Sequence, residues 1–451
     1  MPFIAIGQTT AYIQLHDPDP GVGSGFGIAV AISGDHAFVS ESFSEPGSLL
    51  PGHERVHVFY RHEGGMNAWG WKQTLTAPDG DDIGFGLSLS AENGRLAVHQ
   101  PSHGVEYFGL YPLRRSRSCI YEMGSDGSWD LSFANAAELI LDDGWISGMG
   151  GSHIELSGLD LLMSGDTTVQ DTSIIANPWI RIPRLEVWTS VNGQWQYQRS
   201  FEGGLDLGQA TLFMDHVGIL GEGFNLIDPV TGDSVFNLEA VWSIDGNGGW
   251  LACRRNGGFD IYNTLDLTSP HPILFQGPVD SFQIDSSIFL IVEDEWGISP
   301  VIHIYAYDPF LEQWSLHTVV SDISEQYWVN ASDVSAEGSA IFSLRSIDAS
   351  NFDPSEVRIV EVFSPTGIVE EEDLSFLSYD PISDVYRLGC GSDMERPEFF
   401  ATNVVGRKVK IDPAYDVDHI HIPRSTLPLG ITIVTLQKQQ GKCHFKLIGG
   451  H

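Results

Sequence analysis

The chain has 451 residues and is 42% apolar, with 12 Trp and 24 Phe, so it can build a large core and is not globally disordered. Sixty acidic and 23 basic residues give a net charge of −37. A surface of that sign repels phosphate backbones and anionic lipids, which argues against nucleic-acid and membrane partners. The 49 glycines follow no collagen period and therefore indicate many tight turns between short strands.

The N-terminal stretch MPFIAIGQTTAYIQLHDPDP has neither the basic start nor the long apolar run of a secretory signal. No apolar segment approaches the roughly 18 residues of a membrane helix, so we expect no membrane insertion. The four cysteines are far apart and form no CxxC pair, which predicts free thiols rather than a disulfide framework or a zinc site. They are Cys119, Cys253, Cys390 and Cys443.

Internal repetition begins with GSGFGIAVAISGDHAFVS at 23–40 and DIGFGLSLSAENGRLAVH at 82–99. Each has Gly-Phe-Gly, an alternating apolar run, a polar turn and a second alternating run, which predicts an antiparallel hairpin with one buried face. A second hairpin with a Trp in its second strand follows each unit and recurs along the chain. These tryptophans are Trp71, Trp129, Trp195 and Trp314, and we expect them to pack between repeats. Further hairpins are predicted at 224–238, 259–275 and 357–377.

Two hairpins per unit make a four-stranded blade, and about seven units make a closed ring without exposed sheet edges. We therefore predict an all-β fold, a seven-bladed β-propeller, followed by a small C-terminal β-domain. Because TAYIQLHDPDP resembles the segment that ends the first blade, Thr10–Leu15 is predicted to supply the outer strand of the last blade. The stretch Leu374–Asp393 has three interpretations: an extension of blade seven, the start of an eighth blade, or a linker.

The charge is divided unevenly along the chain. Residues 396–451 contain eight basic and four acidic residues, a net charge of +4, whereas the first 395 contain 15 basic and 56 acidic residues, a net charge of −41. Such a break predicts a separate module with a different neighbour. We place the propeller at residues 1–394 and a small basic β-module at residues 395–451.

The Gly-Phe-Gly units resemble the FG-GAP repeats of integrin α-subunits and bacterial surface proteins. The similarity is clear in the first two units, weaker at 146–165 and absent beyond residue 204, so it covers about a third of the chain. Many FG-GAP repeats carry a DxDxDG calcium loop, but the corresponding turns here, SGDHA and AENGR, are too short and too poor in acids to hold calcium. Asp17, Asp19 and Asp79 lie before the Gly-Phe-Gly, together with Asp81 and Asp82, and are interpreted as turn residues.

Residues 399–449 resemble a small β-module of bacteriophage virion proteins. The pattern consists of a Gly-Arg strand (Gly406–Ile411), a run ending in Ile-Pro (His419–Pro423), Leu-Pro-Leu-Gly, a strand ending in Gln, a Gly-Lys turn and a final strand. The resemblance implies a tail fibre, spike or capsid decoration anchored by this module. Its candidate anchoring residues are Arg407, Lys408, Lys410, Lys438, Lys442 and Lys446.

No catalytic or cofactor constellation is found: GxSxG, GxxxxGK[ST] and HExxH are absent, and GVGSGFG lacks the strand-to-helix setting of a phosphate loop. His419 and His421 could share a strand face, but no third ligand is suggested for them, nor for His99 and His103. We predict no enzyme activity, no cofactor and no metal. Aromatic residues outside the repeat pattern are the candidate ligand-binding residues. They are Trp69, Trp145, Trp296 and Trp328.

Together these patterns predict a non-enzymatic virion protein that displays an acidic propeller for adhesion or receptor binding. Its expected partners are other virion proteins, contacted through the C-terminal module, and a host-surface glycan or protein; a homo-oligomer is a further alternative. The expected location is the virion, assembled in the host cytoplasm. The competing interpretations are a cellular lectin-like propeller, cytoplasmic or exported without a signal peptide, and a propeller polysaccharide lyase or hydrolase.

Overall fold

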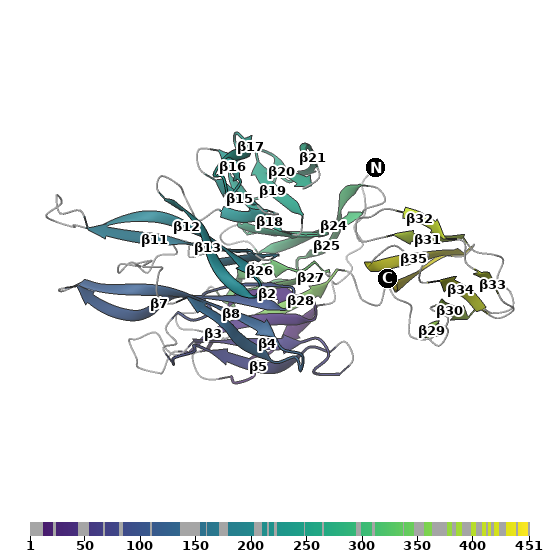
Figure 1. Ribbon diagram of the computed structural model, residues 1–451, viewed down its shortest axis with the longest axis horizontal. Coiled ribbons are helices and arrows are strands. Elements are labelled where there is room, and N and C mark those ends of the chain that lie inside the picture. Colours follow the sequence, from purple (N-terminus) through teal and green to yellow (C-terminus); the bar gives the residue numbers. More distant parts are fainter. Residues whose placement is uncertain are drawn as a thin grey trace. The chain divides into compact units, whose positions relative to one another are not determined.

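The structure is a computed structural model of the whole chain, and the residues that it describes form strands and turns with no helix (Figure 1). Among these residues no helix is long and apolar enough to cross a membrane. Beyond the C-terminal strands given below, the described residues are 12–362 with gaps. The gaps are 21–23, 44–53, 66–67, 81–83, 109–110, 136–153, 159, 171–178, 203–209, 214–215, 221–222, 248, 264–265, 295–298, 309–311, 337 and 347–355.

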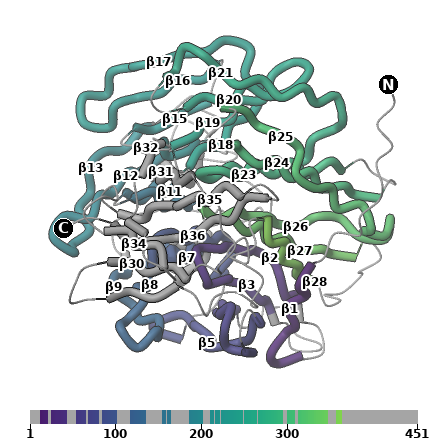
Figure 2. The backbone as a smooth tube through the Cα atoms, turned by 90° about the vertical axis from the view of Figure 1, so that its right-hand side faces the viewer, coloured from purple at the N-terminus to yellow at the C-terminus, as the bar shows by residue number. Residues whose placement is uncertain are grey.

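Seven four-stranded antiparallel sheets follow one another along residues 12–362 and form the blades of a propeller. Figure 2 shows them in chain order around a common centre. Blade 1 contains β2 (Ser24–Ser33), β3 (His36–Phe43), β4 (Glu54–Tyr60) and β5 (Gly70–Thr76). Blade 2 contains β6 (Ser88–Glu92), β7 (Arg95–Phe108), β8 (Tyr111–Met123) and β9 (Trp129–Asn135). Blade 3 contains β10 (Ile154–Ser157), β11 (Asp160–Gln170), β12 (Trp179–Val191) and β13 (Gln194–Glu202).

The remaining blades repeat this order, with the first strand innermost. Blade 4 contains β14 (Ala210–Phe213), β15 (His216–Leu220), β16 (Phe224–Ile227) and β17 (Ser234–Leu238). Blade 5 contains β18 (Ser243–Asn247), β19 (Trp250–Arg255), β20 (Gly258–Asn263) and β21 (Asp266–Leu274). Blade 6 contains β22 (Ser281–Asp285), β23 (Ile288–Glu293), β24 (Val301–Asp308) and β25 (Gln313–Val320). Blade 7 contains β26 (Tyr327–Val334), β27 (Ser339–Ser346), β28 (Glu356–Glu361) and, as its outer strand, β1 (Ile13–Leu15).

The N-terminal strand closes the ring, as the sequence predicts. β1 pairs antiparallel with β28 in the register Ile13 opposite Ile359 and Leu15 opposite Val357. The chain therefore enters its last blade first, and the two ends of the propeller segment are joined by backbone hydrogen bonds. Closure in this way removes an unpaired edge from blade 7.

The core is divided among the seven contacts between neighbouring blades. Each of the seven buried clusters draws its side chains from two adjacent blades; one, for example, joins Phe38 and Val58 of blade 1 to Leu96 and Trp129 of blade 2. Alternation along the strands explains this arrangement, because successive residues point to opposite faces and each face packs on a different neighbour. Every blade therefore depends on two others for burial.

The Gly-Phe-Gly repeat has a packing role in both blades that carry it. Phe26 and Phe85 are each 1% exposed, and the glycines that follow them have φ of 89° at Gly27 and 88° at Gly86. These are left-handed conformations that side chains rarely adopt. A Cβ at Gly86 would also lie 2.8 Å from the side chain of Val56.

The repeated tryptophans pack between blades at three of four positions. Trp129 lies 4.8 Å from Phe38, Trp195 lies 6.3 Å from Phe133 and Trp314 lies 5.2 Å from Trp250, measured between ring centroids. Trp71 is the exception: it is 49% exposed and donates its indole N–H to Thr74 at 3.1 Å. The prediction of inter-blade packing is confirmed for the first three and wrong for Trp71, which lies near the outer edge of blade 1.

The C-terminal unit comprises Phe363–His451 and the short segment Asp308–Glu312. One sheet has the order β29–β30–β34–β33, and the other has the order β32–β31–β35–β36. Their bounds are β29 (Leu377–Asp380), β30 (Val385–Gly389), β31 (Glu398–Thr402), β32 (Lys408–Ile411), β33 (Ala414–Tyr415), β34 (His419–Pro423), β35 (Gly430–Lys438) and β36 (Gly441–Gly449).

The division between the two units falls after Val362, earlier than the boundary at 394/395 expected from the charge break. The reason is strand pairing: β30 pairs with β34, so the stretch left open at 374–393 contributes to the C-terminal unit and not to a blade. The blade count is therefore seven.

Ring closure by β1 makes a first testable prediction. Leu15 is 4% exposed and packs with Phe26 and Ile359 across the contact between blades 7 and 1, whereas Gln14 on the same strand is exposed. We expect Leu15→Ala to lower the free energy of unfolding by about 2–4 kcal/mol and Gln14→Ala by less than about 0.5 kcal/mol. Urea unfolding of both variants measures this; equal losses would contradict the closing role of β1.

Candidate functional site

The innermost strands of the blades surround a polar cavity of about 360 Å³ at the centre of the propeller. Six of these strands, β2, β6, β10, β18, β22 and β26, contribute lining residues. Four carboxylates belong to this lining, those of Glu155, Asp245, Asp280 and Asp333, and three of them, Glu155, Asp245 and Asp333, bind the backbone of a neighbouring blade. A central cavity of this kind is a common ligand site in closed β-folds, so the partners of these acids decide what the cavity can do.

Each of the three carboxylates accepts a hydrogen bond from the backbone of the following blade. Asp333 accepts from the N–H of Ile32 at 2.8 Å, Glu155 from Leu212 at 2.9 Å and Asp245 from Ile284 at 2.6 Å. All three amides lie on the innermost strands of their blades, β2, β14 and β22. The acids therefore connect blade 7 to 1, blade 3 to 4 and blade 5 to 6.

Burial shifts the protonation of two of these acids. Loss of solvent raises the pKa of Asp333 to about 7, with a smaller contribution from the negative charge of Glu155, while the backbone hydrogen bonds act in the opposite direction. The pKa of Asp245 is also raised well above its usual value by burial and by Glu155. The cavity can therefore take up protons near neutral pH, and its acids already serve as contacts between blades.

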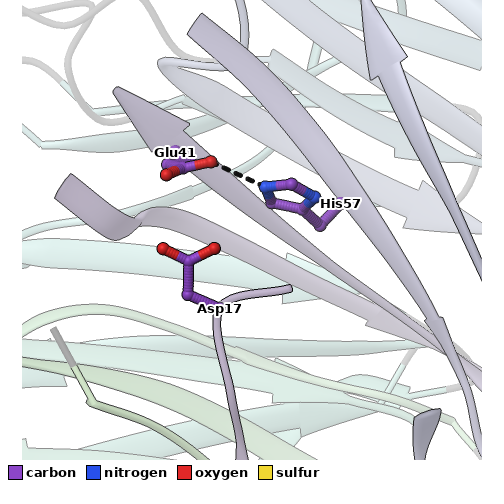
Figure 3. A group of neighbouring side chains, drawn as sticks. All are labelled: Asp17, Glu41 and His57. Atoms are coloured by element: carbon purple, nitrogen blue, oxygen red, sulfur yellow. Dashed lines mark hydrogen bonds and ion pairs between the residues drawn. The ribbon is translucent and has the colours of Figure 1, made fainter. Parts of the chain in front are cut away.

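A second cluster lies in blade 1, where Asp17, Glu41 and His57 converge (Figure 3). Asp17 follows β1, Glu41 lies on β3 and His57 on the neighbouring strand β4. One oxygen or nitrogen from each residue lies within 4.8 Å of the others. The side chains of Glu41 and His57 are 0% and 1% exposed, and Asp17 is half-buried, so the cluster opens to solvent on the Asp17 side.

Hydrogen bonds from His57 and Arg55 hold the side chain of Glu41 in place. His57 Nε2 lies 2.8 Å from Glu41 Oε2, and its Nδ1 lies 3.0 Å from the hydroxyl of Thr74. Arg55 donates from Nε to the same oxygen of Glu41 at 2.5 Å and from Nη1 to Asp19 at 3.1 Å. Burial raises the pKa of Glu41, but the bonds from His57 and Arg55 outweigh it and lower the pKa to about 2. Glu41 is therefore ionised at any physiological pH.

The Asp–Arg part of this cluster recurs in other blades. In blade 2, Arg117 lies 2.9 Å from Asp79 and donates to Gln100 at 3.0 and 2.6 Å. In blade 7, Arg358 lies 3.5 Å from Asp322 and donates to Glu356 at 2.8 Å. Each arginine lies on the third strand of its blade and reaches the aspartate in the turn that precedes that blade. We call this arrangement the turn clamp.

Two of the aspartates interpreted as turn residues, Asp17 and Asp79, have partners in or beside their turns. Asp17 accepts a hydrogen bond from the backbone N–H of Asp19 at 2.8 Å, which closes the turn after β1. Asp79 pairs with Arg117 in the next blade, and Asp81 and Asp82 lie outside the described residues.

The candidate ligand-binding tryptophans have different environments. Trp69 is half-buried at the contact between blades 7 and 1, where it donates to Glu361 at 3.4 Å and lies 5.2 Å from the guanidinium of Arg61. Trp328 is 39% exposed near the start of β26. Trp145 and Trp296 lie outside the described residues. Of the two that the structure describes, Trp328 is the more exposed, and Trp69 is packed at the contact between blades 7 and 1.

The sequence analysis missed Trp242, the most exposed of the tryptophans whose side chains the structure describes. Trp242 is 55% exposed directly before β18 and borders a cavity of about 350 Å³, together with Arg254, Arg255 and Phe275. Trp242 lies directly before β18, the innermost strand of blade 5, and Trp328 is the second residue of β26, the innermost strand of blade 7. Trp242 also lies outside the repeated tryptophan position, and this sequence feature could have marked it as a candidate ligand-binding residue.

The lysines proposed to anchor the C-terminal module gather on one face of its second sheet. One row of directly opposite residues crosses the four strands in the order Lys408, Thr402, Ile433 and Lys446. Residues directly opposite each other, and residues two apart on a strand, share a face, so Lys408, Lys410, Lys442 and Lys446 fall on the same one. Lys438 ends β35, and Arg407 lies outside the described residues.

This basic face does not extend over the whole C-terminal unit. Residues 363–451 contain nine basic and twelve acidic residues, a net charge of −3. The positive charge predicted for a separate module therefore belongs to one sheet of that unit, whose strands carry five lysines and one glutamate.

Comparison with known proteins yields structural likeness alone. No protein-family description matches the chain, and no curated protein sequence matches it. Among solved structures, the β-propeller domain of the Trilobed protease from Pyrococcus furiosus is 10% identical, with a TM-score of 0.43, covering 75% of this chain and 95% of that one. U3-55K is 8% identical, with a TM-score of 0.38, covering 72% and 91%. Sqt1 of Saccharomyces cerevisiae is 9% identical, with a TM-score of 0.37, covering 80% and 100%. The chain is a seven-bladed β-propeller by its own strand pairing.

The raised pKa of Asp333 makes the stability of the propeller depend on pH. Its folded-state pKa of about 7 lies above the ordinary value of 3.8, so the folded protein binds the extra proton between about pH 4 and 7. The contribution of this group is present below pH 4 and is lost as the pH rises through 7. We expect Asp333→Asn, which cannot titrate, to gain stability relative to the wild type with rising pH, by at most about 4 kcal/mol.

Urea unfolding at pH 4, 6 and 8 tests this expectation. Asp233→Asn, which removes the same charge from an exposed turn, is the control and should run parallel to the wild type. Parallel curves for Asp333→Asn as well would contradict the assignment.

Proposed function

We propose that this chain is a non-enzymatic bacteriophage virion protein that displays its propeller for adhesion or receptor binding. The observation that carries the proposal is the placement of Lys408, Lys410, Lys442 and Lys446 at register positions that share one face of a sheet, in a chain that is otherwise acidic. A face of that kind is suited to an acidic neighbour in an assembly. It also lies within the segment whose sequence resembles phage virion modules.

The closure of the ring supports an anchoring role for the C-terminal unit. Because β1 completes blade 7, the propeller does not need the C-terminal strands to close its sheet. The described strands β29–β36 pair among themselves in two further sheets. One part of the chain is thus available for attachment, and the other for contact with a host surface.

The partners of the central acids favour binding over catalysis. Asp333, Glu155 and Asp245 each accept a backbone hydrogen bond that joins two blades, so their substitution would disturb the ring itself. The exposed indoles of Trp242 and Trp328 are the more suitable contact points for a glycan, because an aromatic face stacks on the apolar side of a sugar ring. This is the adhesive role that the FG-GAP resemblance implies.

Particle incorporation tests the anchoring function. Phage particles purified from the source of this chain should contain it in stoichiometric amounts. Replacing Lys408, Lys410, Lys442 and Lys446 together by Ser should lower its incorporation at least tenfold while leaving the propeller folded, as monitored by its thermal unfolding. Replacing the same four by Arg keeps the charge and should preserve incorporation.

Two outcomes would overturn the proposal. A chain found free in cells and absent from particles would favour the cellular lectin-like alternative, to be followed on a glycan array. New reducing ends or a loss of viscosity when the protein meets a host polysaccharide would favour the lyase or hydrolase alternative.

A further inference from the structure

We propose that Asp17, Glu41 and His57 form a binding site for one divalent metal ion, with zinc as the expected occupant. The proposal is independent of the virion role, because all three residues lie in the propeller unit. They are the one group of three or more His, Cys, Asp or Glu side chains, among the described residues, whose ligand atoms lie within reach of a common ion.

The first observation that points to a cation is an oxygen of Glu41 without a partner. Glu41 Oε2 accepts from both Arg55 and His57, but Oε1 has no hydrogen-bond partner although the side chain is fully buried. A buried carboxylate oxygen left unpaired is costly, because its hydration is lost without replacement. Figure 3 shows the carboxylate of Asp17 pointing toward this group, so an ion between the two would contact both.

The local charge fits a divalent ion. Arg55 is the cation of the cluster, and its Nη1 is paired with Asp19 at 3.1 Å. The same guanidinium lies 2.5 Å from Glu41, so one arginine contacts two carboxylates, and Asp17 adds a third to the cluster. Asp17 supplies the third ligand-type group, and its Oδ1 accepts from the N–H of Asp19.

Comparison of blade 1 with blade 2 shows that the turn clamp does not require the ligand-type side chains of the proposed metal site. The registers of the two sheets place Gln100 and Cys119 of blade 2 at the positions of Glu41 and His57. Ala77 lies two residues before the clamp aspartate Asp79, as Asp17 lies two residues before Asp19. Blade 2 nevertheless keeps its clamp, with Arg117 bound to both Asp79 and Gln100. The clamp therefore needs neither a carboxylate at the Glu41 position nor a histidine at the His57 position, and blade 1 has a ligand-type side chain at all three.

The surroundings of His57 suit zinc. Zinc takes imidazole nitrogen and carboxylate oxygen as ligands, and a zinc-bound histidine usually donates its other N–H to a nearby oxygen. Here the Thr74 hydroxyl lies 3.0 Å from Nδ1. In the structure, Nε2 donates its N–H to the carboxylate oxygen Oε2 of Glu41. Zinc binding requires the other tautomer, in which Nδ1 carries the ring proton and donates it to Thr74, while the lone pair of Nε2 faces the metal. Water from the open side would complete a four-coordinate shell.

The test titrates zinc chloride into the chelator-treated full-length protein at pH 7.5 by calorimetry, with bound zinc counted by elemental analysis. We expect about one zinc per chain and a rise in the midpoint of thermal unfolding on binding. Asp17→Asn and His57→Gln should weaken zinc binding at least tenfold while their secondary structure, followed by circular dichroism, stays that of the wild type.

A matched control is present in blade 6. His303 Nε2 lies 2.8 Å from Glu293, the same separation as in the His57–Glu41 pair, and no third ligand group accompanies it among the described residues. His303→Gln should therefore bind zinc like the wild type. No zinc bound by the wild type, or equal binding by the wild type and the Asp17→Asn and His57→Gln variants, would overturn the proposal. A loss of binding in His303→Gln alone would also overturn it.

Discussion

Closure of the ring between blades 7 and 1 is the constraint on which the propeller depends, because each blade buries its faces against two neighbours. Backbone pairing of β1 with β28 is one part of that closure. The other is Arg61, 5% exposed, whose guanidinium lies 3.0 Å from Asp35, 3.3 Å from Glu361 and 2.8 Å from Ser339. A buried guanidinium is stable only when such partners compensate for its lost hydration. Because Glu361 and Ser339 belong to blade 7, Arg61 favours the arrangement in which blade 7 packs on blade 1.

The same logic accounts for acids at the centre of an acidic protein. An innermost strand has amides that face the preceding blade, and a carboxylate of that blade accepts from such an amide in a stronger hydrogen bond than a neutral acceptor does. Blade 2 uses a hydroxyl instead: Ser90 accepts from the N–H of Leu156 in blade 3 at 2.9 Å. The identity of the acceptor varies while its position persists. The acids of the central cavity therefore act as contacts between blades.

Local patterns predicted the propeller well, because alternation, turns and repeated Gly-Phe-Gly units are properties of short segments. The closing strand was also predictable, since 11–20 resembles the end of blade 1 in sequence. The unit boundary was not, because the pairing of β30 with β34 depends on register between distant segments.

Asp17, Glu41 and His57 come from three strands or turns separated by gaps of 24 and 16 positions. Nothing in their spacing predicts that they converge; the pairing of β3 with β4 and the placement of the turn after β1 decide it.

The blade 1 cluster and the ring closure are physically connected. Asp17 lies two residues after Leu15, the last residue of the closing strand, whereas Glu41 and His57 belong to the blade that the strand approaches. Arg55 already ties Asp19 of this turn to Glu41. An ion held by Asp17, Glu41 and His57 would add a second tie between the same two elements, so its binding energy would act directly on the step that closes the ring. The contact that the chain must close without a connecting loop is that of β1 with β28 inside blade 7, whereas β1 and β2 are joined by the turn that carries Asp17. An ion bound by Asp17, Glu41 and His57 would hold this turn against blade 1 and so help to fix the position of β1 for its pairing with β28. No other blade receives its outer strand from the far end of the propeller segment, which gives a physical reason for the extra ligand-type side chains to occur in blade 1.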